Sequence, residues 1–414
     1  MNLPKNPPSP SRAPTIAALL CGLAAGALYA STAAFALLPG LPSTAIASAL
    51  GLGDNLLFDN PLFALLVRLF DRTPLGAAAG ATALSVLCGA WCVFAVSWLV
   101  GRIRPAGSPL PSDPEDDARE VSRSQRPVRS AQTLAAVVTG LFAAVSLPVW
   151  VVATRSLWGL FSCALFLLAA VGLECYRTRG GRWRLYLISL LYGFGMPLYA
   201  GFVLFAPLFF VCVLAVMRSR GAWSAKALVL SAFCLLPGLA SYFFWAERFS
   251  HAAPLSFLGY DGFWSVLYRG ILRLQWVSIV HALSLPHLLL LLTLTLVPAV
   301  ILAIRPSPAR HSGAMGLVLR LVILAALLGA LFDLPYSPWQ MTGPNRAMPF
   351  AYLVMAAVAG EICAEFRVLR IRRPAVGGWM ASALRALVPH LALLVPVARH
   401  ICNIELAEHG MLLQ

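Results

Sequence analysis

The chain has 414 residues, of which 60% are apolar and 11% are charged, and its mean hydropathy is +0.80. A soluble domain carries roughly a quarter charged residues and cannot hide so much apolar surface from water. The composition therefore excludes a soluble protein and predicts an all-α polytopic membrane protein. The net charge of +15 would suit a nucleic-acid partner, but its placement along the chain, given below, argues against one.

Eleven stretches are candidate transmembrane helices, since a helix that crosses the bilayer needs about 20 apolar residues. They are 15–37, 75–100, 132–153, 156–175, 185–196, 198–217, 225–245, 283–304, 315–333, 347–366 and 386–401. The first stretch is long, and the only charged residues before it are Lys5 and Arg12. This does not fit a cleavable signal peptide. We expect one transmembrane domain over 1–404 and a short outer tail over 405–414.

The first outer loop, 38–74, is expected to hold two short helices. Ser43 or Thr44 can cap the first helix, which should stop at Gly51–Gly53. Asn60 and Pro61 are typical of a helix start, and they predict a second helix over 61–71. This second helix is apolar apart from Arg68 and Asp71 and is too short to span, so we expect it at the membrane surface.

Asp54 and Asp59 lie on the loop between these two helices. A carboxylate at the membrane face can act as a general base or bind a divalent metal. Aspartate also favours loops and caps, so both residues can equally be ordinary solvated loop residues.

Residues 104–131 are expected to face the cytoplasm. The proline-rich stretch 105–114 is followed by mixed charges, and we interpret the whole segment as a flexible linker.

No charge interrupts the chain from Leu185 to Met217. A single helix over this stretch would be roughly 50 Å long, far more than the bilayer core. Because Gly193, Gly195 and Pro197 lie in its middle, we expect two short spans folded back at Gly195–Pro197. The alternative is one long kinked helix.

The outer loop over 246–282 carries candidate anion ligands. Arg269 and Arg273 are four residues apart and would share one helical face, which suits a phosphate or pyrophosphate group. Arg248 lies in the same loop, and Arg346 directly precedes a later span. The alternative is that these arginines are interfacial anchors that reach lipid phosphates non-specifically.

The distribution of basic residues predicts the orientation. With the N-terminus inside and the hairpin included, cytoplasmic segments and span ends hold 23 of the 31 Lys and Arg residues, and the outer side holds the other eight. This positive-inside pattern explains the net charge without nucleic acid. Eleven spans then place the C-terminus outside. We expect the protein to lie in the cytoplasmic (inner) membrane.

The nine cysteines lie almost entirely in apolar runs and show no paired CxxC spacing, so we expect packing residues rather than disulfides or metal ligands. The spans are nearly free of charge, which argues against an ion-coupled carrier.

Three segments resemble a known family. They are "NPLFALLVRLF" at the surface helix, "RWRLYLISLLYGFGMPLYAGFVLFAPLFF" at the predicted hairpin, and "PNRAMPFAYLVMAAVAGE" near the end. They are similar to bacterial relatives of protein O-mannosyltransferase-like membrane proteins, which have the GT-C glycosyltransferase fold. The resemblance implies a transferase that takes a sugar from a polyprenyl-phosphate donor at the outer face, with an aspartate of the first outer loop as base.

The family carries an acidic motif straight after the first span, where this chain has "PGLPST". Either Asp54 or Asp59 then serves as the base, with Arg248, Arg269, Arg273 or Arg346 neutralising the donor phosphate, or the chain is a non-catalytic relative. That relative would be a scaffold or would bind a lipid-linked sugar. A lipid flippase or transporter is a further alternative.

Overall fold

A computed structural model describes residues 12–35, 41–52, 61–103, 118–157, 159–198, 202–203, 206–220, 222–250, 262–273 and 276, and parts of 352–367. These residues form helices and turns, without a strand among them, which confirms the all-helical class. Within the described ranges, five helices are long and apolar enough to cross a membrane. The expected spans 283–304, 315–333 and 386–401 lie outside these ranges.

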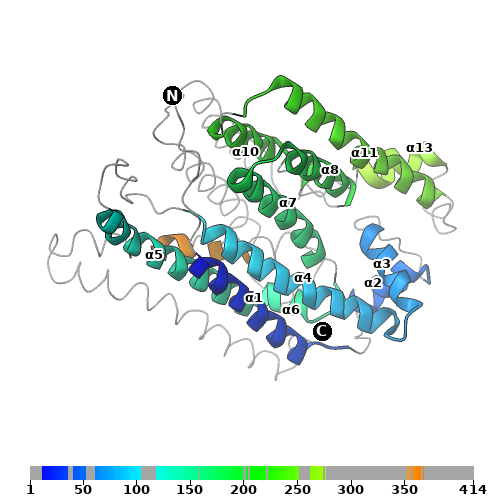
Figure 1. Cartoon of the computed structure of the whole chain (residues 1–414). Coiled ribbons are helices and arrows are strands. Elements are labelled where there is room, and N and C mark those ends of the chain that lie inside the picture. The colour runs from blue at the N-terminus through cyan, green and yellow to red at the C-terminus, as the bar shows by residue number, and fades with distance from the viewer. Residues whose placement is uncertain are drawn as a thin grey trace.

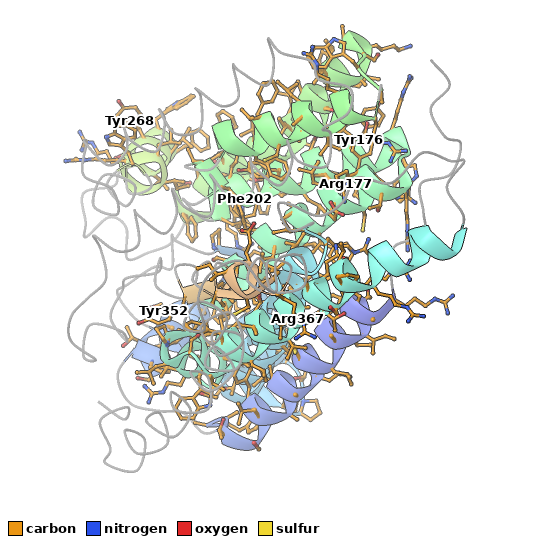
Figure 2. All side chains as sticks on the ribbon, turned by 90° about the vertical axis from the view of Figure 1, so that its left-hand side faces the viewer. Tyr176, Arg177, Phe202, Tyr268, Tyr352 and Arg367 are labelled. Atoms are coloured by element: carbon orange, nitrogen blue, oxygen red, sulfur yellow. The ribbon has the colours of Figure 1, made fainter. Side chains whose placement is uncertain are left out.

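The helices form two layers (Figures 1 and 2). The first layer contains α1 (Arg12–Thr32), α4 (Gly76–Val100), α5 (Ala118–Val145) and α6 (Leu147–Ala153). The second contains α7 (Gly159–Arg179), α8 (Arg182–Leu198), α10 (Ala206–Ser219) and α11 (Ala225–Ser250), with α13 (Phe263–Ser265) and the π-helix η1 (Val266–Leu272). In Figure 2, Tyr352 marks a described piece of the expected span 347–366, which lies with the first layer.

The two layers meet along α4 and α7. The indole Nε1 of Trp91 donates to the carbonyl of Ala164 at 3.2 Å, and the hydroxyl of Ser85 donates to the carbonyl of Leu157 at 3.1 Å. Side chains on α4 thus bind backbone carbonyls near the start of α7, which fixes the register of the two helices. Trp91 also tilts against Phe94, with ring centroids 5.5 Å apart.

The first layer packs closely because small residues line its helix contacts. A Cβ added to Gly140 of α5 would lie 2.5 Å from the Cβ of Cys21 on α1. A Cβ added to Gly22 would lie 2.7 Å from the Cβ of Phe94. Close backbone approach of this kind is typical of membrane helix bundles, where van der Waals packing rather than the hydrophobic effect drives association.

The chain reverses between α8 and α10, as the two-span interpretation predicts. The guanidinium of Arg220, just after α10, donates to the carbonyls of Tyr176 and Arg177 at the end of α7. Only the Gly180–Gly181 turn separates α7 from α8. The end of α10 therefore lies beside the start of α8, which excludes a single long helix over 185–217.

The predicted position of the reversal was wrong. Helix α8 continues through Gly195 and Pro197 to Leu198. Gly195 provides space rather than a turn, because a Cβ there would lie 2.3 Å from the ring of Phe202. The hydroxyl of Tyr192 donates to the carbonyl of Phe202 at 2.7 Å, which ties the last turns of α8 to the segment after it.

Two predictions for the third span also need correction. The expected single helix over 132–153 breaks at Ser146, whose backbone is extended (ψ 128°), because Pro148 in the first turn of α6 has no N–H to continue the helical ladder. The part of the expected linker that the structure describes, 118–131, is helical and belongs to α5. Its sequence contains Ala, Arg, Glu and Gln, which are good helix formers.

The two short helices expected between the first two spans are present among the described residues. Helix α3 (Pro61–Asp71) has the predicted bounds. Helix α2 (Leu41–Leu50) ends at Gly51 as expected, in a left-handed conformation (φ 79°) that glycine adopts without strain. It begins at Leu41, before Ser43 and Thr44, so the prediction that one of them caps it was wrong.

The bundle has two chemically different ends. Arg102 follows α4, Arg177 and Arg179 end α7, and Arg220 follows α10, and these basic residues gather at one end. Helices α2, α3 and α13 lie at the other end, at the right of Figure 1. The helices thus bring together the residues that the charge pattern assigns to one side of a membrane.

Candidate functional site

A groove of about 610 Å³ lies between α3, α7, α8 and α11, at the end of the bundle that carries the short helices. Its volume is in the range of ordinary ligand pockets. Its lining is almost wholly apolar: Leu62, Leu65, Leu165, Leu168, Leu191, Phe194, Gly195, Leu198, Pro237, Ala240, Ser241, Phe244 and Trp245. The hydroxyl of Ser241 donates to the carbonyl of Gly238 at 2.5 Å, so this polar lining group is already satisfied.

The groove opens sideways onto the surface of the bundle. Five of its lining residues are exposed, among them Leu168 by 38%, Phe194 by 42% and Phe244 by 58%. In a bilayer, an exposed apolar surface on spanning helices faces hydrocarbon, so a lipid chain can enter this groove without crossing water.

Helix α3 closes one side of the groove and is held firmly against the spans. Phe63 is fully buried and meets Phe161 of α7 edge-on, with ring centroids 6.1 Å apart. A Cβ on Gly80 of α4 would lie 2.4 Å from Phe70, so this glycine makes room for the far end of α3. Leu62 and Leu65 are thereby placed along the groove.

Two arginines lie at the end of the groove. Arg68 comes three residues after the lining residue Leu65, and Arg248 comes three residues after Trp245. Burial lowers the pKa of the Arg68 guanidinium, and the positive charge of Arg248 lowers it further. Neither has an ion-pair partner among the described residues, so the pair favours an anion between them.

Arg68 is held in position by the helix before it. Its Nε donates to the carbonyl of Ala49, in the last turn of α2, at 2.5 Å. The Ala49 carbonyl is one of the last four carbonyls of α2, which have no N–H partner within the helix. A cation is favoured at this end of a helix. One bond therefore both caps α2 and orients the guanidinium.

The structure places three of the predicted arginines. Arg248 is exposed in the last turn of α11, beside the groove. Arg269 and Arg273 are exposed on the outer side of η1. The opposite side of η1, with Val266, Leu267 and Ile271 buried, packs against Trp245 and Ala246 of α11. Arg248 thus lies one helical turn beyond the lining residue Trp245, whereas Arg269 and Arg273 face away from this packed side.

The other predicted site residues, Asp54, Asp59 and Arg346, lie outside the described residues. Helix α3 begins at Pro61, two positions after Asp59. In the part of the chain that the structure describes, no group of three or more His, Cys, Asp or Glu side chains is arranged to bind a metal ion. The eight described cysteines are all unpaired and buried or half-buried, as expected of packing residues.

Arg68 was not predicted as a site residue. The sequence shows it as one of two charged groups on an otherwise apolar surface helix, which is a signal of a specific role. Its proximity to Arg248 is not visible in the sequence, because the contact depends on how α3 packs against the end of α11.

No family model, curated protein or solved structure matches the chain. The functional argument therefore rests on the groove, on the charges at its end and on the sequence resemblance described above.

Proposed function

We propose that this chain is a membrane glycosyltransferase of the GT-C type that transfers a sugar from a polyprenyl-phosphate donor to an acceptor hydroxyl. The observation that carries the proposal is the laterally open apolar groove with Arg68 and Arg248 at its end. A polyprenyl phosphate matches this arrangement, because it has a long hydrocarbon chain for the apolar groove and a compact anionic head for the arginines.

The tail would enter between Leu168, Phe194 and Phe244, three of the exposed lining residues. Moving a hydrocarbon tail from the bilayer into an apolar groove gains little free energy, because both surroundings are apolar. The tail therefore sets the position of the donor more than its affinity. Affinity and orientation would come from the head group, where two guanidiniums can each donate paired hydrogen bonds to phosphate oxygens.

The same arginines have a chemical role in transfer. The acceptor hydroxyl attacks the anomeric carbon, a new C–O bond forms, and the bond from that carbon to the phosphate oxygen breaks. The electron pair of the broken bond stays on the phosphate, whose negative charge increases. Fixed cations at that position stabilise the transition state more than the ground state.

Asp59 or Asp54 would accept the proton of the acceptor hydroxyl, or would hold a divalent metal. Asp59 is favoured over Asp54 because it lies closer in sequence to α3, whose residues Leu62 and Leu65 line the groove. We assign Arg269, Arg273 and Arg346 as further ligands of the donor phosphate or of neighbouring lipid head groups.

The basic end of the bundle supports an orientation with that end in the cytoplasm. The groove would then open at the outer face of the cytoplasmic membrane, the N-terminus would lie inside, and the eleven predicted spans would place the C-terminus outside. The GT-C-like arrangement of these spans is part of the proposal.

The groove, as far as the described residues form it, favours the transferase over the flippase alternative. Its lining comes from the first part of α7 and the last parts of α8 and α11, all toward the same end of the bundle. A path for flipping would need to continue toward the other end. The non-catalytic alternative, a protein that binds a lipid-linked sugar without turnover, uses the same groove and is separated by experiment.

The experiment measures sugar transfer by the detergent-purified protein from a panel of polyprenyl-phosphate sugars. The Asp54→Asn and Asp59→Asn variants are measured in the same way. Loss of transfer in one folded variant would identify the base. Unchanged transfer in both would keep the enzyme and discard the assigned base. Saturable binding of one donor without transfer would identify the non-catalytic protein, and neither binding nor transfer would refute the proposal.

A further inference from the structure

The basic end of the bundle, opposite the groove, gathers arginines from separate segments. Arg102 follows α4, Arg177 and Arg179 lie in the last turn of α7, Arg184 lies in the first turn of α8, and Arg220 follows α10. In the segments that form this cluster, 97–103, 174–184 and 216–220, Glu174 is the only acidic residue. Within these described segments, the arginines therefore outnumber the acidic residues.

That carboxylate is fully used by one arginine. Glu174 accepts two hydrogen bonds from Arg177, at 2.5 Å from Nε and 2.7 Å from the terminal nitrogen. Arg102 lies near this pair. Burial lowers the pKa of the Arg102 guanidinium, Glu174 raises it, and Arg177 and Arg179 lower it. Among the described residues, neither Arg102 nor Arg179 forms a salt bridge with a carboxylate.

The arginines are oriented rather than loosely distributed. The guanidinium of Arg102 lies over the ring of Trp98, 4.4 Å from its centroid. Arg220 donates to the carbonyls of Tyr176 and Arg177. A Cβ on Gly180, whose φ is 71°, would lie 2.6 Å from a terminal nitrogen of Arg220. The glycine turn is therefore shaped to receive this side chain.

The surroundings of the cluster favour a lipid head group as the ligand. Trp183 is 60% exposed directly after the Gly180–Gly181 turn, and the guanidinium of Arg184 lies 5.0 Å from its ring centroid. Exposed tryptophans next to basic residues at span ends are typical of the membrane–water interface. Lipid phosphates occupy that level, and basic pockets between helices on the cytoplasmic side suit anionic head groups.

We propose that Arg102 and Arg179, at the neighbouring ends of the packed helices α4 and α7, bind the phosphate of one anionic phospholipid. The site is separate from the donor groove and does not depend on the proposed transfer reaction. Occupancy would tie α4, of the first layer, to α7 of the second.

The test is native mass spectrometry of the detergent-purified protein titrated with phosphatidylglycerol or phosphatidylcholine. We expect one saturable phosphatidylglycerol and no matching phosphatidylcholine site. Arg102→Gln and Arg179→Gln should each weaken binding about tenfold, since each removes charge-assisted hydrogen bonds. Arg72→Gln with Arg126→Gln is the matched control, because both residues are exposed arginines outside the cluster.

Equal loss in the control pair and in the cluster variants would show diffuse attraction to positive charge and would overturn the site. Absence of a saturable phosphatidylglycerol would overturn it as well. Glycerol phosphate, the head group without its tails, should not displace the lipid at equal concentration. Displacement would assign the site to a soluble phosphate instead. Circular dichroism of each variant confirms that its helices are retained.

Discussion

Gly238 of α11 lies directly on Gly193 of α8: a Cβ added to Gly238 would be 2.2 Å from the carbonyl carbon of Gly193. The obstacle is backbone, which cannot rotate away as a flexible side chain can. Each glycine gives up helix propensity relative to alanine, and the close backbone approach compensates for this loss. Because Pro237, Ala240 and Ser241 border the groove, the contact also fixes one of its walls.

The first prediction concerns this contact. Gly238→Ala should lower the free energy of unfolding by about 3 kcal/mol, since the added methyl forces α8 and α11 apart. Gly26→Ala is the control, because a Cβ there would meet only the Cβ of Ala90, at 3.3 Å. Thermal unfolding in detergent, followed by circular dichroism, measures both. Equal effects of the two substitutions would contradict the close contact.

The second prediction concerns Tyr29, which is fully buried and donates to the carbonyl of Ala144 at 2.9 Å. That carbonyl would ordinarily accept from the N–H four residues later, but position 148 is proline. Tyr29→Phe would leave a buried carbonyl without a partner and should cost about 2 kcal/mol of stability. Tyr268→Phe, at a residue 72% exposed, should have no measurable effect in the same unfolding assay.

The sequence predicted the features that depend on local chemistry. The bounds of α3 follow from Asn60–Pro61, and α4 follows from an uninterrupted apolar run. Charge placement predicted the reversal after α8, which the contacts of Arg220 confirm. These signals depend on residues close in sequence or on the membrane, so they can be recognised in one sequence.

Features that depend on packing between distant segments were missed. Gly195 looked like a turn residue, but it accommodates the ring of Phe202 inside an unbroken helix. Ser146 interrupts a span that hydropathy alone treats as continuous. The pairing of Arg68 with Arg248 needs the position of α3 against α11. Hydropathy measures what can enter a bilayer, and it carries no information on which faces meet.

The third prediction concerns orientation. Arg72, between α3 and α4, and Lys226, at the start of α11, are exposed at opposite ends of the bundle. A membrane-impermeant maleimide should label Arg72→Cys from the outer side, and Lys226→Cys only after permeabilisation. Sealed vesicles of known orientation provide the measurement, with the unsubstituted protein as the background for native cysteines. Labelling of both from one side would contradict the proposed topology, and the reverse pattern would invert it.

The fourth prediction concerns the head-group end of the groove. Arg248→Ala should weaken binding of a polyprenyl-phosphate donor about tenfold, since it removes charge-assisted hydrogen bonds and leaves α2 capped. Arg68→Ala should weaken binding similarly and also destabilise α2, because Ala49 loses its donor. Arg72→Ala, in the exposed turn after α3, is the control for lost charge. Equal donor affinity in all three variants would remove the arginines from the site.

The fifth prediction tests the groove itself. Ala240 lines the groove and is exposed, so Ala240→Trp should fill the space without disturbing the packed side of α11. Donor binding should fall at least about tenfold, because the indole occupies the volume that the hydrocarbon chain needs. Ala232→Trp is matched in helix, exposure and substitution but lies outside the groove lining, and it should bind the donor as the unsubstituted protein does. If Ala240→Trp also binds normally while both variants keep their unfolding temperature, the lipid tail lies elsewhere and the groove is not the donor site.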